Sequence, residues 1–169
     1  MERFNKVLFD QKKVGDHYDF TLEDGTVVNQ IESPPEYYVE KTSNPKSNFS
    51  TYKEFYFSNG NLKTGGRQFY AFPVGVWKEY SEKGELVSET NEDKPFHFSI
   101  DDLNETMKKK KIDIMKPALG LSVSRSTEPS PAYTVAFPLV PGDLSAFKIF
   151  VFDGTTGKLI NETVSKKTW

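Results

Sequence analysis

Apolar side chains alternate with polar ones in the first part of the chain. Tyr18, Phe20 and Leu22 occupy every second position and are followed directly by Asp24-Gly25. Successive side chains of a strand point to opposite faces, so a period of two indicates a strand with one buried face, and Asp-Gly favours a tight hairpin turn. The pattern therefore predicts a hairpin that begins with a strand over residues 16–23.

A repeat with a period of 24 residues follows in the stretch from Glu54 to Glu89. Each copy reads aromatic residue, polar turn, glycine, polar residue and leucine. The recurring pairs are Tyr56 and Tyr80, Gly60 and Gly84, and Leu62 and Leu86. A strand, a turn closed by glycine and a return strand form a β-hairpin, and repetition of this unit predicts stacked hairpins that share one apolar face.

Further strands and turns are predicted around this repeat. Glu36 to Glu40 is expected to form a short edge strand inside an insertion at about residues 32–48. Gly65-Gly66 and Pro73 are placed in turns, because turns need a positive or a fixed φ angle. The other expected strands cover residues 4–9, 49–57, 61–63, 67–72, 76–80 and 85–90.

One helix is predicted after the polar segment from Asn91 to Pro95. Ser99 suits the N-cap, and Asp102 follows three residues later, as in a capping box. The apolar face of this helix consists of Ile100, Leu103 and Met107. Lys108 to Lys111 lie at its end, where positive charge complements the helix dipole. We expect the helix at about residues 99–111.

The remainder of the chain is predicted to be an antiparallel meander of three or four strands. Its strands are expected at residues 119–125, 132–139, 146–153 and 157–164. The side chains expected to pack against the helix are Ile149, Val151, Leu159 and Val164. The predicted fold class is therefore α+β, mainly β, with stacked antiparallel hairpins, one helix and a final meander. We expect a hairpin-repeat domain over 1–93 and a small α+β domain over 94–169.

The repeated segments resemble a known family. FYFSNGNLKTGG and GVWKEYSEKGELVSE are similar to the MORN-type repeats of bacterial proteins, in particular the MORN-variant repeats of the YwqK-like antitoxin family, where Y-x-x-N-G-x-L-K and G-x-W-x-x-Y-x-x-x-G-x-L recur. In this chain Ala71-Phe72-Pro73 replaces the usual polar turn. The phrase VFDGTTGKLINET is similar to the last hairpin of PepSY-like domains. The first resemblance implies an antitoxin or immunity protein that neutralises a toxin by direct binding.

Composition narrows the classes of function. Aromatic residues make up 14% of the chain, which favours strands, and a net charge of −2 gives no general attraction to nucleic acid. Cysteine is absent from the sequence, which excludes disulfides and thiolate metal sites. No window is as apolar as a membrane span, and the start MERFNKVLFDQKK lacks the apolar core of a signal peptide. We expect a cytoplasmic protein with no transmembrane segment and no nucleic-acid partner.

Residues that suggest catalysis are few. His17 and His97 are the two histidines and lie far apart in the sequence, and the Ser-x-x-Lys strings fall outside helix starts. Gly154 to Lys158 lacks the spacing of a G-x-x-x-x-G-K-[ST] phosphate loop. We therefore expect no catalytic residues, no metal site and no cofactor.

The remaining expectation is a protein partner. Aromatic residues on loops and sheet faces are common at protein interfaces. The candidate binding residues are Tyr37, Tyr38, Phe69, Tyr70 and Trp77. The alternative is a packing role, in which the tyrosines cover the end of the sheet and Trp77 packs against Leu62 and Leu86.

Three functions stay open at this point. The first is an immunity protein or antitoxin, whose slightly acidic charge would suit a basic nuclease toxin. The second is a lipid- or envelope-associated scaffold that uses Lys108 to Lys111. The third is an enzyme whose polar residues converge in a cleft. The identity of the partner and the oligomeric state stay open as well.

Overall fold

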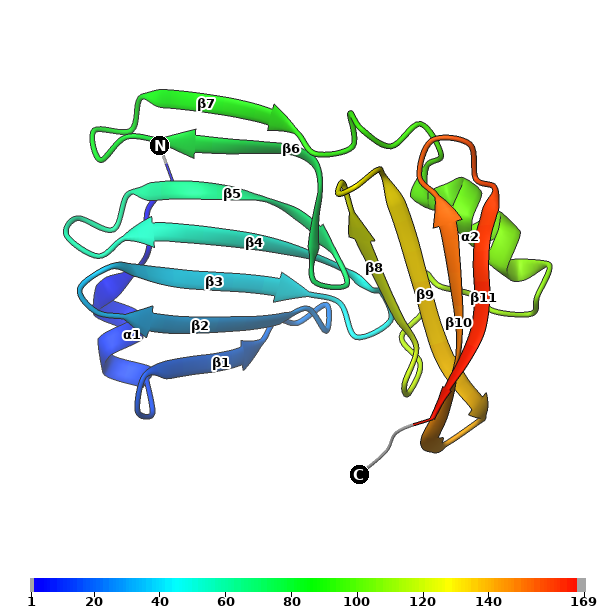
Figure 1. Ribbon diagram of the computed structural model, residues 1–169. Coiled ribbons are helices and arrows are strands. Elements are labelled where there is room, and N and C mark those ends of the chain that lie inside the picture. Colours follow the sequence, from blue (N-terminus) through cyan, green and yellow to red (C-terminus); the bar gives the residue numbers. More distant parts are fainter. Residues whose placement is uncertain (1, 167–169) are drawn as a thin grey trace. The chain divides into compact units, whose positions relative to one another are not determined.

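The computed structural model describes residues 2–166 and is mainly β, as predicted (Figure 1). The chain divides into two compact units. The first comprises Met1–Phe69 and Pro73–Glu92, and the second comprises Tyr70–Phe72 and Asp93–Trp169.

The first unit is built on a seven-stranded antiparallel meander. Its strands lie side by side in chain order, each joined to the next by a turn (Figure 1). They are β1 His17–Thr21, β2 Val27–Ser33, β3 Tyr37–Ser43, β4 Phe49–Tyr56, β5 Leu62–Phe69, β6 Phe72–Tyr80 and β7 Leu86–Asn91. Because every connection is a hairpin, the predicted stack of hairpins is confirmed as a single continuous sheet.

The 24-residue repeat brings equivalent positions of the two copies together. The Tyr56 hydroxyl donates to the carbonyl of Tyr80, 24 positions later, at 2.8 Å. The side-chain amides of Asn59 and Asn61 both donate to the carbonyl of Glu82, at 3.0 and 2.7 Å. The turn of one hairpin is thus hydrogen-bonded to the turn of the next.

The two turns are closed by glycines in the left-handed region, Gly60 with φ +74° and Gly84 with φ +84°. In the second copy, exposed Lys83 and Glu85 stand at the positions of Asn59 and Asn61. The β6–β7 hairpin therefore lacks the side-chain amides by which the β4–β5 hairpin is hydrogen-bonded to the next turn.

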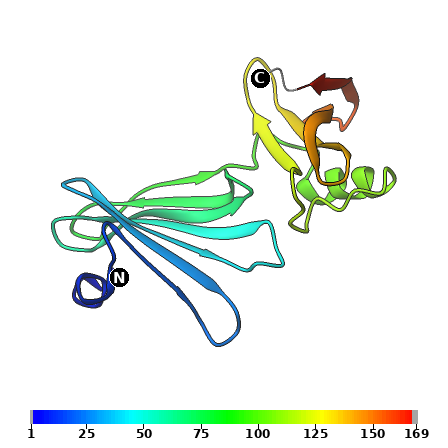
Figure 2. The same cartoon turned by 90° about the horizontal axis from the view of Figure 1, so that it is seen from below.

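The strand predicted at residues 4–9 is wrong, because residues 6–9 belong to the helix α1, Lys6–Lys12. The Asn5 side chain accepts a hydrogen bond from the Leu8 amide and caps the helix. Phe9 is fully buried, and its ring centroid lies 5.7 Å from that of Tyr38. Figure 2 shows α1 lying off one face of the sheet.

Three local predictions in this unit are also wrong. The segment from Glu36 to Glu40 is no edge strand, because β3 pairs with both β2 and β4. Gly65-Gly66 lies within β5, and Pro73 is the second residue of β6. The glycines serve close packing here, since a Cβ on Gly66 would come within 2.5 Å of the Trp77 ring nitrogen.

The second unit pairs a four-stranded antiparallel sheet with the helix α2, Ile100–Lys108. The strands are β8 Ser122–Ser126, β9 Ala132–Val140, β10 Asp143–Asp153 and β11 Leu159–Lys166, in the order β11-β10-β9-β8. The predicted capping box is confirmed: Ser99 Oγ accepts from the Asp102 amide, and the Asp102 carboxylate accepts from the Ser99 amide, both at 3.1 Å.

The predicted inward face of this meander is wrong. The side chains buried in β10 are Phe150 and Phe152, whereas Leu159 and Val164 of β11 are exposed. Apolar residues occupy both faces of the phrase AFKIFVFD, so a period of two does not decide the orientation. The face with two adjacent rings, Phe150 and Phe152, is the buried one, while Phe147, Ile149 and Val151 on the other face are half-buried. The other buried hydrophobic residues of this part of the chain are Phe96, Leu103, Met107, Ile114, Val123, Tyr133 and Val135.

Candidate functional site

One face of the sheet in the first unit carries a group of half-buried aromatic side chains. Tyr38 and Phe55 point to the α1 side, where both contact the ring of Phe4. Because side chains alternate along strands, the residues next to them project from the opposite face. Four rings on that opposite face, which we call the aromatic face, are Tyr37, Tyr52, Tyr56 and Trp77.

Trp77 is held flat against the sheet. Its ring stacks on Tyr52 at a centroid distance of 5.9 Å, with 29° between the planes, and its Nε1 donates to the carbonyl of Arg67 at 3.0 Å. The ring crosses β5 at Gly66, where the missing side chain makes room for it. A side chain fixed on two sides loses little further freedom on binding, which favours its use as an anchor.

Ionic groups link the rings of this face. The Tyr52 hydroxyl donates to the Glu54 carboxylate at 2.8 Å, and Lys63 pairs with the same carboxylate at 3.4 Å. The Lys63 ammonium also lies 5.3 Å from the ring centre of Tyr37. Burial, together with the hydrogen bond to Glu54, raises the pKa of Tyr52, so its phenol stays neutral at physiological pH.

The five residues predicted to bind a partner lie in three different places. Tyr37 and Trp77 belong to the aromatic face. Tyr38 and Phe69 are in the core, with 2% and 0% of their surface exposed. Tyr70 belongs to the second unit, where its hydroxyl donates to the carbonyl of Ile114 at 3.1 Å and burial raises its pKa.

Tyr52 and Tyr56 of this face were missed by the sequence reasoning. The sequence did contain a signal for them. Tyr52 and Tyr56 are four positions apart in β4 and so lie on the same face, opposite to the buried Phe55. The alternative packing role for Trp77 also differs from the structure, because the ring lies on Gly66 and Tyr52 and Leu86 is exposed.

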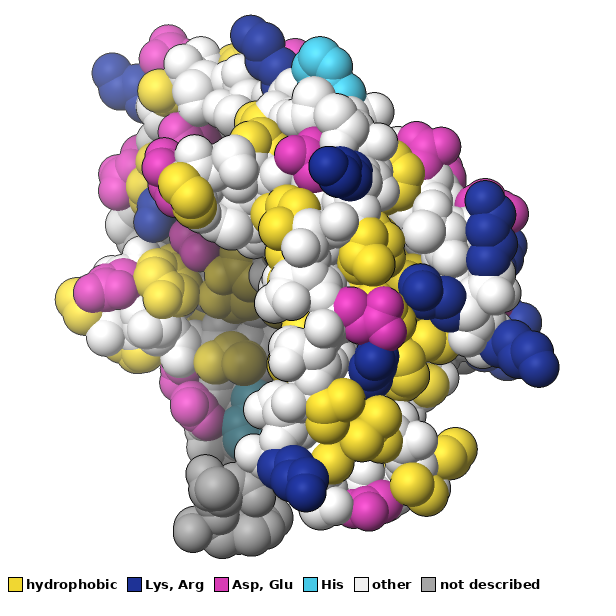
Figure 3. Space-filling view, turned by 45° about the vertical axis from the view of Figure 1, so that its right-hand side comes forward, with side chains coloured by type: hydrophobic (Ala, Val, Ile, Leu, Met, Phe, Trp, Pro, Cys, Tyr) yellow, Lys and Arg dark blue, Asp and Glu magenta, His cyan; other side chains and the backbone are white. Residues whose placement is uncertain are grey.

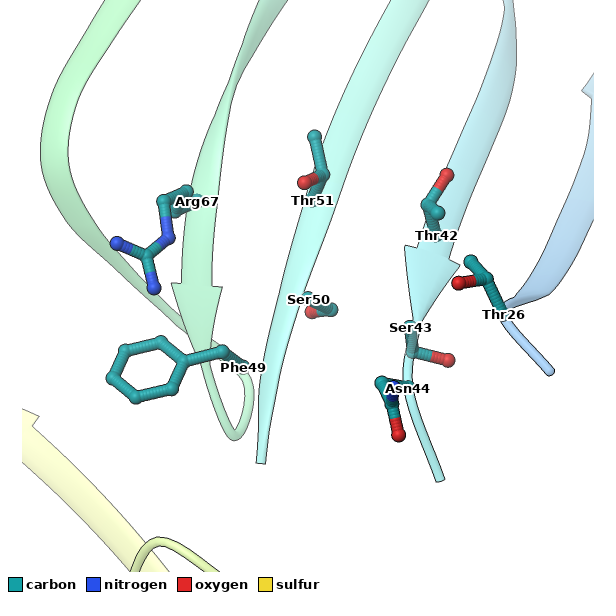
Figure 4. Close-up of a pocket in the computed structure, with 8 residues that line it drawn as sticks. All are labelled: Thr26, Thr42, Ser43, Asn44, Phe49, Ser50, Thr51 and Arg67. Carbon is teal, nitrogen blue, oxygen red and sulfur yellow. The ribbon is translucent and has the colours of Figure 1, made fainter. Parts of the chain in front are cut away.

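A second feature of the first unit is a polar pocket of about 210 Å³ near the ends of β2 to β5 (Figure 4). It is lined mainly by hydroxyl groups, with the Arg67 guanidinium 4.6 Å from the ring centre of Phe49 at one side. Ser50 Oγ is buried there without a hydrogen-bond partner among the described residues. Arg67 is the one ionisable side chain in the lining, so the pocket offers hydrogen bonds and a positive charge but no general base.

Within residues 2–166, no group of three or more His, Asp or Glu side chains is placed to hold a metal ion. Over the same range, no helix has the length and apolar character needed to cross a membrane. His17 lies in the first unit beside Asp16, with Nδ1 2.8 Å from the carboxylate, and His97 lies in the second unit.

No family model, no curated protein and no solved structure matches this chain.

Proposed function

We propose that this chain is a non-catalytic protein-binding module, and that it acts as an immunity protein or antitoxin that neutralises a cognate bacterial toxin by direct binding. The observation that supports binding is the aromatic face. Tyrosine and tryptophan are enriched among the residues that dominate protein interfaces, and rings surrounded by charged and polar groups are typical of such surfaces.

The aromatic face also combines two features that favour binding, which are rigid rings and adjacent charged groups. Trp77 and Tyr52 are already held by their neighbours, and Glu54 and Lys63 supply charges of both signs beside them. The toxin part of the proposal rests on the resemblance of the repeats to MORN-variant antitoxins, which gives the class of partner and a cytoplasmic site of action.

The test is recovery of a stoichiometric partner. Tagged protein is purified from its native cells, and the proteins that co-purify are identified by mass spectrometry. We expect one dominant partner with a toxin-like catalytic domain, and we expect co-expression of the chain to protect cells from it.

Two matched variants locate the interface. Trp77→Ala should weaken binding to the recovered partner by about 2 kcal/mol, the scale of an interface hot spot. Phe20→Ala, a ring on the edge strand β1, is the control and should leave binding unchanged. Circular dichroism at increasing temperature shows whether each variant is folded. Recovery of the bare chain, or a partner that binds Trp77→Ala as well as the parent, contradicts the proposal.

A further inference from the structure

The second unit contains an apolar groove of about 440 Å³ between the β9–β10 hairpin and the segment that follows α2. Its floor and walls are mainly apolar, and two lysines lie at its edge. The lining residues on which the argument depends are Lys111, Lys116, Leu119, Leu121, Phe137 and Pro141.

The groove is a packed feature of this unit. Gly120, with φ +76°, fits so closely that a Cβ there would lie 2.6 Å from Pro138 and 2.7 Å from Leu144. The segment after α2 is therefore pressed against the hairpin, and both sides of the groove are held in place. A preformed groove needs little rearrangement to bind.

Large apolar side chains remain exposed around it. Leu119 has 69% of its surface in solvent and Val140 has 59%, and Leu139 and Leu144 are exposed as well. Figure 3, which brings the side of the second unit forward, shows hydrophobic side chains at the surface among Lys and Arg side chains. A gathered apolar patch with charged surroundings is typical of an interaction site.

The charge around the groove is positive. Lys108 to Lys110 directly precede Lys111 in the chain. Asp113 is the one carboxylate of the lining, where it accepts from the Met115 amide and pairs with Lys116 at 3.6 Å. The lining thus keeps one positive charge in excess, that of Lys111. Lys111 is exposed at the edge of the groove and forms no ion pair within the described part of the chain.

Lys111 also occupies an unusual backbone position. Its amide donates to the carbonyl of Lys108, and the Ile112 amide donates to the carbonyl of Met107, which is the Schellman pattern at a helix end. Lys111 has φ +64°, where glycine is normally found. A lysine in this position strains the backbone, and the side chain it places at the groove suggests a functional reason for keeping it.

We propose that this groove binds an acidic segment of a protein partner, with a large apolar side chain of that segment seated between Leu119 and the β9–β10 hairpin and a carboxylate beside Lys111. Charge complementarity favours an acidic occupant, and the concave apolar shape favours a side chain over the flat surface of a bilayer. This inference goes beyond the proposed function, since it concerns the second unit and stands if the aromatic face binds nothing.

The experiment selects binders from a displayed library of random short peptides, with the full-length chain as bait. We expect the enriched peptides to combine Asp or Glu with a large apolar residue, and their affinity, measured by fluorescence anisotropy, to fall as salt is raised. Leu119→Ser should weaken binding about tenfold, because it removes an exposed apolar contact without disturbing the core.

Lys111→Gly is a second test, in which stability and peptide binding should change in opposite directions. Glycine relieves the positive φ, so the variant should unfold at a higher temperature than the parent while binding the selected peptides about tenfold more weakly. Lys83→Ala and Leu86→Ser, exposed residues of the first unit, are the controls and should leave peptide binding unchanged.

Several outcomes overturn the proposal. These are the absence of any enriched peptide, enrichment of neutral or basic peptides, and unchanged binding to both Leu119→Ser and Lys111→Gly. Co-flotation of the chain with anionic vesicles that depends on Leu119 overturns it too, because the groove would then serve a membrane surface.

Discussion

At the scale of single residues, Gly66 and Trp77 show how one missing side chain positions another. The Trp77 ring lies where a Cβ of Gly66 would be, and the same ring donates to the carbonyl of Arg67. Gly66 has no positive φ angle, so its backbone conformation does not require glycine. Glycine is needed here because the Trp77 ring leaves no space for a side chain. The position of the indole in the aromatic face is thus set by the strand beneath it.

Gly66→Ala should therefore destabilise the first unit by about 1–3 kcal/mol, the usual cost of overpacking. Urea denaturation measures the change in the free energy of unfolding. In a Trp77→Ala background the same substitution should cost much less, because the obstructing ring is gone. Additive effects of the two substitutions would show that the ring and the glycine are independent.

Asp153 gives a pH-dependent prediction at the same scale. Its carboxylate accepts from the Thr156 amide at 2.7 Å, from the Thr156 hydroxyl and from the Thr155 amide, and these bonds lower its pKa from the ordinary value of 3.8. A lowered pKa in the folded state means that the carboxylate stabilises the fold above about pH 4. That stabilisation is lost as the pH falls through the folded-state pKa.

Urea midpoints measured across this pH range check the prediction for Asp153. The parent should lose stability on acidification faster than Asp153→Asn, which keeps an acceptor oxygen but does not titrate. Equal slopes for the two proteins would remove Asp153 as a source of acid sensitivity.

At the scale of elements, the repeat provides a natural pair of substitutions. Asn61 is buried and donates to the carbonyl of Glu82, whereas its counterpart Glu85 is exposed. Asn61→Ala should cost about 1–3 kcal/mol, since it removes the hydrogen bond to the carbonyl of Glu82 and the one that Asn61 accepts from Arg3 Nε. Glu85→Ala should change the free energy of unfolding by less than about 0.5 kcal/mol. Thermal and urea unfolding measure the stability of the two variants. Similar losses of stability would contradict the view that only the first copy holds its neighbour by side-chain hydrogen bonds.

Elements with one dominant local signal were predictable from the sequence. The capping box from Ser99 to Asp102 placed α2, and the Gly60 and Gly84 turns placed two hairpins. The short helix α1 was not predicted, because Asn5 is a weak cap signal without a capping box and the consecutive apolar residues from Val7 to Phe9 show no helical period.

Other differences arise from contacts that local patterns do not contain. Gly65-Gly66 has the composition of a turn, and only the Trp77 ring across β5 explains its place in a strand. The orientation of β10 was not decided by its pattern, because both of its faces carry apolar residues. The aromatic face was predictable in part, through Tyr37 and Trp77, but the burial of Tyr38 follows from its contact with α1, which the sequence did not reveal.

At the scale of the whole molecule, the two units are not simply successive in the chain. Tyr70–Phe72 belongs to the second unit although the residues on both sides belong to the first. Inside the second unit, the Arg125 guanidinium lies 5.0 Å from the ring centre of Phe72 and pairs with Asp93 at 2.7 Å. Three residues supplied from an earlier part of the chain thus contribute to the packing of this unit.

Phe72→Ala should lower the stability of the second unit by about 3 kcal/mol, the usual cost of removing a buried ring. Native-state hydrogen exchange at the Leu103 amide, bonded to the carbonyl of Ser99 at 3.0 Å, reports on that unit. Tyr70→Phe removes one hydrogen bond and should cost about 1 kcal/mol. Unchanged protection of the Leu103 amide in Phe72→Ala would show that the second unit is stable without this ring.

The replacement of Asn59 and Asn61 by Lys83 and Glu85 in the second copy has a consequence for how such a sheet could lengthen. The first copy carries the amides that bond the turn of its neighbour, and the second carries exposed charged side chains in their place. A duplicated block inserted before the second copy would meet a compatible partner on both sides. A block added after it would find none, so growth of this array by gene duplication is confined to its interior.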